Sequence, residues 1–168
     1  MPIVQSTQRI SARRLAVAAE RLLEASTLCA IATADASGRP HINTAYFAWT
    51  PDWRVVWLSD PGAKHSRNLE GRPAVAVAVY DSRQTWGKPD RGIQLFGRAA
   101  GPGREARGAY EARFPTRDRD LGAYRLYEVR ARTMKLFDEE VFGAGTFVTA
   151  RVRAGRLEWV RTDVYRAR

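Results

Sequence analysis

Cysteine, histidine and lysine are all scarce in this chain of 168 residues. The sequence has one Cys and two His, and Lys accounts for only three of its 28 basic residues. A single Cys excludes an internal disulfide, and the few thiol and imidazole groups are not spaced to bind zinc. Because Cys29 lies in an apolar run, it is interpreted as a buried structural thiol and not as a reactive one.

Long apolar runs and targeting segments are missing as well. No stretch approaches the roughly 20 apolar residues that a membrane-spanning helix needs. The first eight residues lack the charged and then apolar pattern of a secretory signal. We therefore expect a cytoplasmic protein without a membrane partner.

The positive charge of the chain is strong but evenly distributed. The net charge is +10 at pH 7, and 25 of the 28 basic residues are Arg, interspersed with 18 acidic residues. The sequence has no run of five residues with the same charge, and no helix-turn-helix, zinc-finger or RNA-binding motif is present. Such diffuse charge is typical of a solvated surface or of a preference for acidic small molecules, and it disfavours a nucleic-acid partner.

The apolar pattern predicts one domain built mainly of antiparallel strands. A helix is expected over residues 11–26, with Ser11 as its cap, and a meander of three strands over residues 28–33, 41–49 and 54–58. Further strands are expected over residues 73–80, 92–99, 124–130 continuing to 137, 146–152 and 157–160, with a helix over residues 105–114. The Val/Ala run at residues 73–80 predicts a strand buried on both faces, and Gly97 suggests a bulge or bend.

A basic turn and helix follow the third strand of the meander. Ser59 ends this strand, a Pro-Gly turn follows, and Lys64, His65 and Arg67 open a short helix. The free N–H groups and the dipole of a first helical turn attract anions, and nearby hydroxyl and cationic donors strengthen that attraction. The segment predicts a phosphate-binding corner, with a basic surface helix as the alternative.

Three segments in this order resemble the pyridoxamine 5′-phosphate oxidase-like family of flavin-binding split β-barrels. They are residues 28–47, residues 58–77 and residues 92–99, and the resemblance covers roughly residues 11–138. It implies a mainly β (α+β) fold, a six- to seven-stranded antiparallel split barrel with flanking helices. We expect a single FMN-binding domain over residues 1–168, of which residues 1–10 form an N-terminal extension.

The resemblance also implies a homodimer with FMN in a groove between the two subunits. The second strand of the meander would run along the flavin ring, and the end of the third would meet the ribityl chain and phosphate. The basic helix would supply phosphate ligands. The cofactor-binding residues implied in this way are Asn43, Thr44, Ala45, Tyr46, Leu58, Ser59, Lys64, His65, Arg67, Asn68 and Gln94.

Two departures from the family pattern bear on the ligand. His65 stands where a second cation is usual, and an unperturbed His is mostly neutral near pH 7. Asn43 and Ala48 replace the Arg and Lys of the oxidase that makes pyridoxal phosphate. We therefore expect a substrate other than pyridoxamine 5′-phosphate.

The functional hypothesis is a flavin-dependent oxidoreductase acting on a small molecule that the sequence does not identify. No general acid or base is assigned. One alternative is a reductase on the same fold that uses the deazaflavin F420, whose acidic tail would suit an Arg-rich surface. Another is a haem-binding relative with His41 or His65 as the axial ligand, and a third is a non-catalytic flavin-binding protein.

Overall fold

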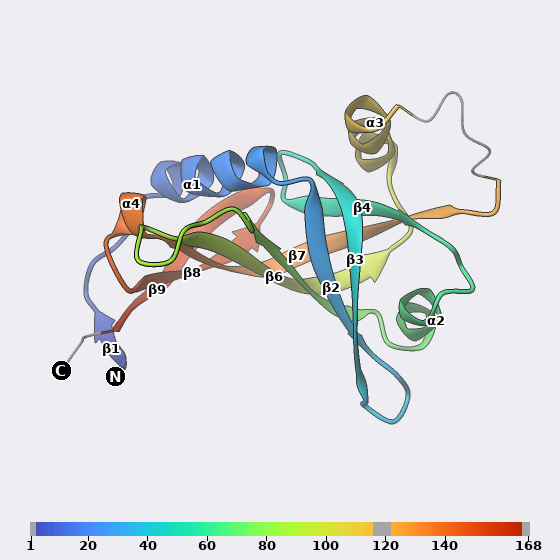
Figure 1. The fold of residues 1–168 in the computed structure, drawn as a ribbon, viewed down its shortest axis with the longest axis horizontal. Helices are drawn as coiled ribbons and strands as arrows, with labels where there is room; N and C mark the ends of the chain where they lie inside the picture. The colour runs from blue at the N-terminus through green and yellow to red at the C-terminus, as the bar shows by residue number, and fades with distance from the viewer. Residues whose placement is uncertain (1–2, 116–121, 166–168) are drawn as a thin grey trace. The chain divides into compact units, whose positions relative to one another are not determined.

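The computed structural model describes residues 3–115 and 122–165, and the described residues form nine strands and four helices (Figure 1). In chain order they are β1 (Ile3–Ser6), α1 (Ala12–Ala25), β2 (Leu28–Ala34), β3 (Pro40–Trp49), β4 (Arg54–Ser59), α2 (Lys64–Gly71), β5 (Ala74–Tyr80), β6 (Arg91–Ala100), α3 (Arg104–Arg113), β7 (Arg125–Asp138), α4 (Glu139–Phe142), β8 (Thr146–Arg153) and β9 (Arg156–Tyr165). Over these residues, none of the helices has the length and apolar character that a membrane crossing demands.

The strands form one sheet that closes on itself. Their order is β1-β9-β8-β7-β4-β3-β2-β5-β6, and β6 pairs in addition with β7. That pairing closes six strands, β7, β4, β3, β2, β5 and β6, into an antiparallel barrel, while β8, β9 and β1 continue the sheet beyond it. The mainly β fold and the antiparallel barrel are therefore confirmed.

The chain divides into two compact units. A terminal unit holds residues 1–26, 78–95 and 132–168, and a central unit holds residues 27–77 and 96–131. Each of the six barrel strands contributes residues to the central unit. The single-domain organisation stays a prediction.

In the terminal unit, α1 lies along β9 (Figure 1). One face of α1 is apolar and buried. The hydroxyl of Ser11 accepts a hydrogen bond from the N–H of Arg14 at 3.3 Å, which confirms the predicted cap. Arg21 forms an ion pair with Asp138 at 2.6 Å, and the Asp138 carboxylate also accepts the N–H of Val141 at the start of α4. The buried residues of α1 are Leu15, Ala18, Ala19, Leu22 and Leu23.

The sheet of the terminal unit is longer than the sequence pattern predicts. β8 and β9 form the expected hairpin, and Ala154 and Gly155 at its tip have φ angles of 48° and 73°. β9 continues to Tyr165, and its last four residues pair with β1. The sequence of residues 1–10 has no pattern that predicts a strand there. β1 has only four residues, and its partner strand lies at the other end of the sequence, so local alternation could not reveal it.

The central unit contains the predicted meander. β2 pairs with β3 over its whole length, whereas β3 and β4 pair only over Phe47–Trp49 and Val55–Trp57. Cys29 is buried, and burial raises the pKa of its thiol to about 12, so it is a structural residue as expected. β5 buries Val75, Val77 and Val79 but leaves its alanines half-buried or exposed, so the prediction of burial on both faces was wrong.

A buried carboxylate joins α3 to the strands of the central unit. Glu128 in β7 is fully buried, accepts the N–H of Gly103 at 3.0 Å and pairs with Arg130 at 2.7 Å. Gly103 is the N-cap residue of α3, so the carboxylate also complements the dipole of the helix. With its N-terminus held there, α3 packs Ala106 and Tyr110 against β3 and β4.

Candidate functional site

The end of β4 and the start of α2 form a polar corner, as the sequence predicts. The Ser59 hydroxyl lies 2.6 Å from Nε2 of His65, and both side chains are buried. His65 also stacks on His41 of β3, with ring centroids 6.2 Å apart and an angle of 2° between the rings. Three segments of the central unit, β3, β4 and α2, therefore meet at this corner.

The charge state of His65 follows from its surroundings. Burial lowers the pKa of His65 from its ordinary value of 6.5, and the charge of His41 lowers it further. The imidazole is therefore neutral at pH 7, and one of its nitrogens is already engaged by Ser59. His65 positions the Ser59 hydroxyl without contributing a second positive charge.

The N-terminus of α2 has the groups that an anion requires. Its N-cap residue, Ala63, supplies no side-chain hydrogen bond, so the helix start is open to an external acceptor. Lys64 is exposed and has no ion-pair partner among the described residues. The hydroxyl of Ser66, the third residue of α2, is fully buried and finds no hydrogen-bond partner in the described part of the chain. These donors fit a phosphate group.

Two further residues of the predicted set brace α2. The guanidinium of Arg67 donates to the carbonyl of Gly62 in the preceding turn. The amide of Asn68 donates to Oγ1 of Thr33 in β2 at 3.0 Å, and Thr33 is buried. Figure 1 shows α2 beside β2 and β3, in agreement with these bonds. Both side chains thus hold the corner in place.

The predicted ring-binding segment of β3, Asn43–Tyr46, has one unpaired edge. The N–H of Phe47 donates to the carbonyl of Thr27 on the β2 side. Because backbone groups alternate between the two edges of a strand, those of Thr44 and Tyr46 point away from β2. On that side β4 pairs with β3 only from Phe47 onward. The Phe47–Trp57 pair is the kind that is flanked by hydrogen bonds, so the carbonyl of Tyr46 is used by the N–H of Leu58. The ladder therefore leaves the backbone N–H and carbonyl of Thr44 and the N–H of Tyr46 unused.

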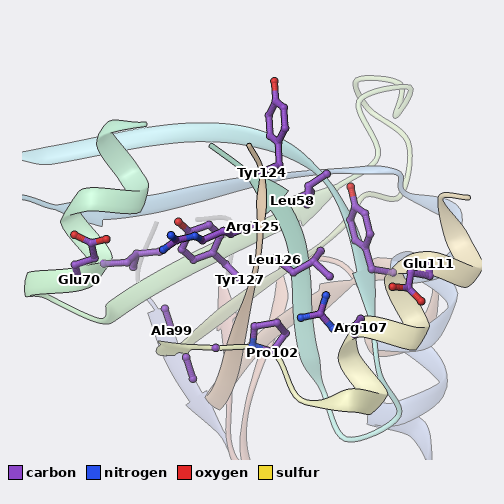
Figure 2. Close-up of a pocket in the computed structure, with 14 residues that line it drawn as sticks. Leu58, Glu70, Ala99, Pro102, Arg107, Glu111, Tyr124, Arg125, Leu126 and Tyr127 are labelled. Atoms are coloured by element: carbon purple, nitrogen blue, oxygen red, sulfur yellow. The ribbon is translucent and has the colours of Figure 1, made fainter. Parts of the chain in front are cut away.

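Two of the predicted residues are not part of the corner. Gln94 is exposed in β6 and belongs to the terminal unit, whereas the other predicted residues belong to the central unit. Leu58 precedes Ser59 in β4, so its side chain points to the opposite face of the strand. There it lines a cavity of about 660 Å³ (Figure 2).

The sequence patterns did not predict this cavity. Its lining comes from five stretches of the chain that share no local motif. The lining residues are Leu58, Leu69, Glu70, Ala99, Ala100, Gly101, Pro102, Arg107, Tyr110, Glu111, Tyr124, Arg125, Leu126 and Tyr127. All of them belong to the central unit.

Comparison with known proteins identifies related sequences. A family model described as pyridoxamine 5′-phosphate oxidase matches residues 15–138. The pyridoxine/pyridoxamine 5′-phosphate oxidase of Rubrobacter xylanophilus is 32% identical over 94 residues, which are 56% of this chain and 41% of that protein. The chain thus matches less than half the length of this curated relative.

Solved structures share the fold at low sequence identity. A haem-binding protein from Mycobacterium smegmatis has a TM-score of 0.66 and 22% identity, over 86% of this chain and 60% of that one. A protein related to general stress protein 26, from Clostridium acetobutylicum, has a TM-score of 0.61 and 13% identity, over 85% and 97% of the two chains. These structures support the fold alone, but the family model spans most of the sequence, including the meander and the corner. The chain therefore belongs to the pyridoxamine 5′-phosphate oxidase family.

Proposed function

We propose that this protein is an FMN-dependent oxidoreductase that acts on a small molecule. The observation that carries the proposal is the corner between β4 and α2, where an uncapped helix start, an exposed Lys64 and a buried Ser59–His65 pair meet. The unpaired edge of β3 belongs to the same unit and is linked to the corner through the His41–His65 stack. Together they offer a phosphate site and a row of backbone groups for a ring.

In this proposal the phosphate is held mainly by α2. The N–H groups of its first turn and the ammonium of Lys64 would donate to the phosphate oxygens. Ser59 would add a hydroxyl whose orientation is fixed by His65. Because His65 is neutral at pH 7, the side-chain charge at this corner comes from Lys64 and Arg67. The guanidinium of Arg67 already donates to the carbonyl of Gly62, so Lys64 is the cation assigned to the phosphate.

The flavin ring would lie along β3. The backbone N–H and carbonyl of Thr44 and the N–H of Tyr46 would hydrogen-bond to ring carbonyls and nitrogens. When bound, the flavin supplies the redox chemistry by accepting or donating a hydride, and the chain contributes orientation and exclusion of water. No described residue is assigned as a general acid or base. Asn43 in place of the Arg of the oxidase that makes pyridoxal phosphate supports a substrate other than pyridoxamine 5′-phosphate.

The proposed protein is a homodimer that encloses the cofactor between its subunits. One face of β2 and β3 is apolar and exposed: Leu28, Ile42 and Tyr46 have exposed fractions of 49%, 68% and 59%. Leu28 and Tyr46 are direct cross-strand partners, and Ile42 lies on the same face of β3 as Tyr46. A patch of this kind beside the ring-binding edge is suited to a second copy of the chain.

Haem is a second candidate ligand, because a structure with this fold binds haem. The described residues favour His41 as the axial ligand, since His65 is buried with Nε2 engaged by Ser59, whereas His41 is half-exposed. Titration with haemin, using His41→Ala as the comparison, tests this candidate. A deazaflavin such as F420 would use the same corner through its phosphate, and direct competition with FMN decides between the two.

The test of the phosphate site compares two lysine variants. Lys64→Ala is expected to weaken FMN binding by about 1.5–3 kcal/mol, the range for a hydrogen bond to a charged group. Lys88→Ala removes the same charge from an exposed loop of the terminal unit and is expected to leave the affinity unchanged. Fluorescence titration measures both.

Riboflavin provides the matched ligand, because it lacks only the phosphate. Its affinity should be the same for the wild type and Lys64→Ala. A Lys64→Ala variant that binds FMN as the wild type does removes Lys64 from the site. A purified wild-type protein that neither carries nor binds a flavin, as judged from its visible spectrum, overturns the proposal.

A further inference from the structure

Arg125 opens β7 directly beside the corner between β4 and α2. It is the cross-strand partner of Ser59, the last residue of β4. Paired residues of neighbouring strands place their side chains on the same face of a sheet. The side chain of Arg125 therefore lies on the face where the Ser59 hydroxyl meets His65. Leu58 and Leu126 form the next pair and lie on the opposite face.

The cavity beside α3 extends to both faces of this strand pair. Leu58 and Leu126 pack on the same cluster as α3, so the α3 side of the cavity is the apolar one. Figure 2 shows Arg125 and Glu70 of α2 on one side of Leu126, and Arg107 of α3 on the other. Arg125 therefore belongs to the α2 side of the cavity, next to the corner.

The guanidinium of Arg125 is free to bind a ligand. Arg125 is exposed and has no ion-pair partner among the described residues, although the carboxylate of Glu70 lines the same side of the cavity. A guanidinium stays charged throughout the ordinary pH range. Arg125 thus brings an unpaired positive charge to the neighbourhood of Ser59.

A phosphate at the corner can use a second cation. A phosphate monoester carries about 1.5 to 2 negative charges at pH 7. Lys64 supplies one positive charge, whereas His65 is neutral and Arg67 donates to the preceding turn. The Cβ atoms of paired residues lie about 4.5–5.5 Å apart, and an arginine side chain is longer than that. The guanidinium of Arg125 can therefore reach a phosphate that accepts a hydrogen bond from Ser59.

We propose that Arg125 is the second cationic ligand of the cofactor phosphate and supplies the charge that His65 does not. This inference rests on the proposed function, because it uses the phosphate site at the corner. The guanidinium would donate two parallel hydrogen bonds to phosphate oxygens. In this arrangement the two cations come from different elements, Lys64 from α2 and Arg125 from β7.

Fluorescence titration of the full chain with FMN and with riboflavin tests this role. Arg125→Gln is expected to weaken FMN binding by about tenfold or more, because it removes a hydrogen bond to a charged group. Its affinity for riboflavin, which has no phosphate, should equal that of the wild type. Arg125→Lys keeps the charge but not the forked geometry, so it should lose less FMN affinity than Arg125→Gln.

Arg132→Gln is the matched control, because Arg132 is an exposed arginine of the same strand that does not line the cavity. It should bind FMN as the wild type does. If Arg125→Gln also binds FMN like the wild type while Lys64→Ala binds it more weakly, the inference is overturned and the proposed function stands. An equal loss of riboflavin affinity in Arg125→Gln overturns the inference too, because the effect would not depend on the phosphate. A wild-type chain that does not bind FMN overturns both.

Discussion

At the scale of single residues, His65 makes stability depend on pH. Its pKa in the folded chain lies below the ordinary 6.5, because burial and the neighbouring His41 oppose the charged form. The unfolded chain therefore binds more protons as the pH falls below about 6.5, and the free energy of unfolding decreases down to the folded-state pKa. Urea unfolding between pH 5 and pH 8 should show this loss in the wild type and a smaller one in His65→Gln.

The His41→Gln variant separates the two causes of the lowered pKa of His65, which are burial and the charge of His41. It removes the charge of His41 but leaves His65 buried against Ser59, so it should retain the larger part of the pH dependence. The interpretation is wrong if His65→Gln loses stability with falling pH as steeply as the wild type does.

The corner shows what the sequence can and cannot predict about individual residues. The order Ser59, Pro-Gly, Lys64 predicts a helix start after a strand, and the structure confirms it, because caps and turns depend on neighbouring residues. The burial of His65 depends on packing of α2 against β3, which the sequence does not encode locally. From the sequence, His65 is expected to be mostly neutral near pH 7, and its burial in the structure lowers its pKa further.

At the scale of secondary structure elements, Gly97 is required by the closure of the barrel. A Cβ at this position in β6 would lie 2.1 Å from the carbonyl oxygen of Arg130 in β7. The sequence suggested a bulge or bend, but the structure shows a close approach between two backbones. Gly97→Ala should destabilise the protein by about 3 kcal/mol, the upper end for overpacking, as measured by urea unfolding.

Gly108→Ala is the comparison for this prediction. Gly108 lies within α3, and nothing stands within 4 Å of a Cβ built on it. The exchange should therefore stabilise the protein by about 0.5–1 kcal/mol, because Ala is the better helix former. If both variants shift stability in the same direction, the close approach at Gly97 is not the cause.

The elements themselves were largely predictable, and the exceptions have physical reasons. Alternation and short polar turns indicate β2 to β4, because such hairpins are local. β1 was missed because it becomes a strand only through pairing with β9. The run of small apolar residues in β5 is not evidence of burial on both faces, because Ala costs little when it is exposed.

At the scale of the whole molecule, closure of the sheet and formation of the cavity depend on distant segments. The pairing of β6 with β7 joins strands separated by α3. The residues that line the cavity beside α3 range from Leu58 to Tyr127. Patterns within short windows of sequence carry no information on such contacts. The resemblance to the family predicted the barrel, whereas the cavity could be found only in the structure.

The apolar face of β2 and β3 leads to a prediction about assembly. Ile42 is the most exposed of its large apolar residues, and we expect it to be buried in a symmetric dimer. Ile42→Glu would place two unpaired carboxylates in that interface, because a twofold contact repeats each residue. The dimer should dissociate at least about a hundredfold more readily than that of the wild type, as measured by light scattering during gel filtration.

Val17→Glu adds the same charge at an aliphatic residue of α1 that is 54% exposed, and it should leave the molecular mass unchanged. If FMN lies between the subunits, Ile42→Glu should also lose FMN, whereas Lys64→Ala should lose FMN and stay dimeric. Loss of the dimer in Ile42→Glu with full FMN affinity would place the cofactor within one subunit. A wild-type protein that is monomeric at micromolar concentration would contradict the proposed dimer.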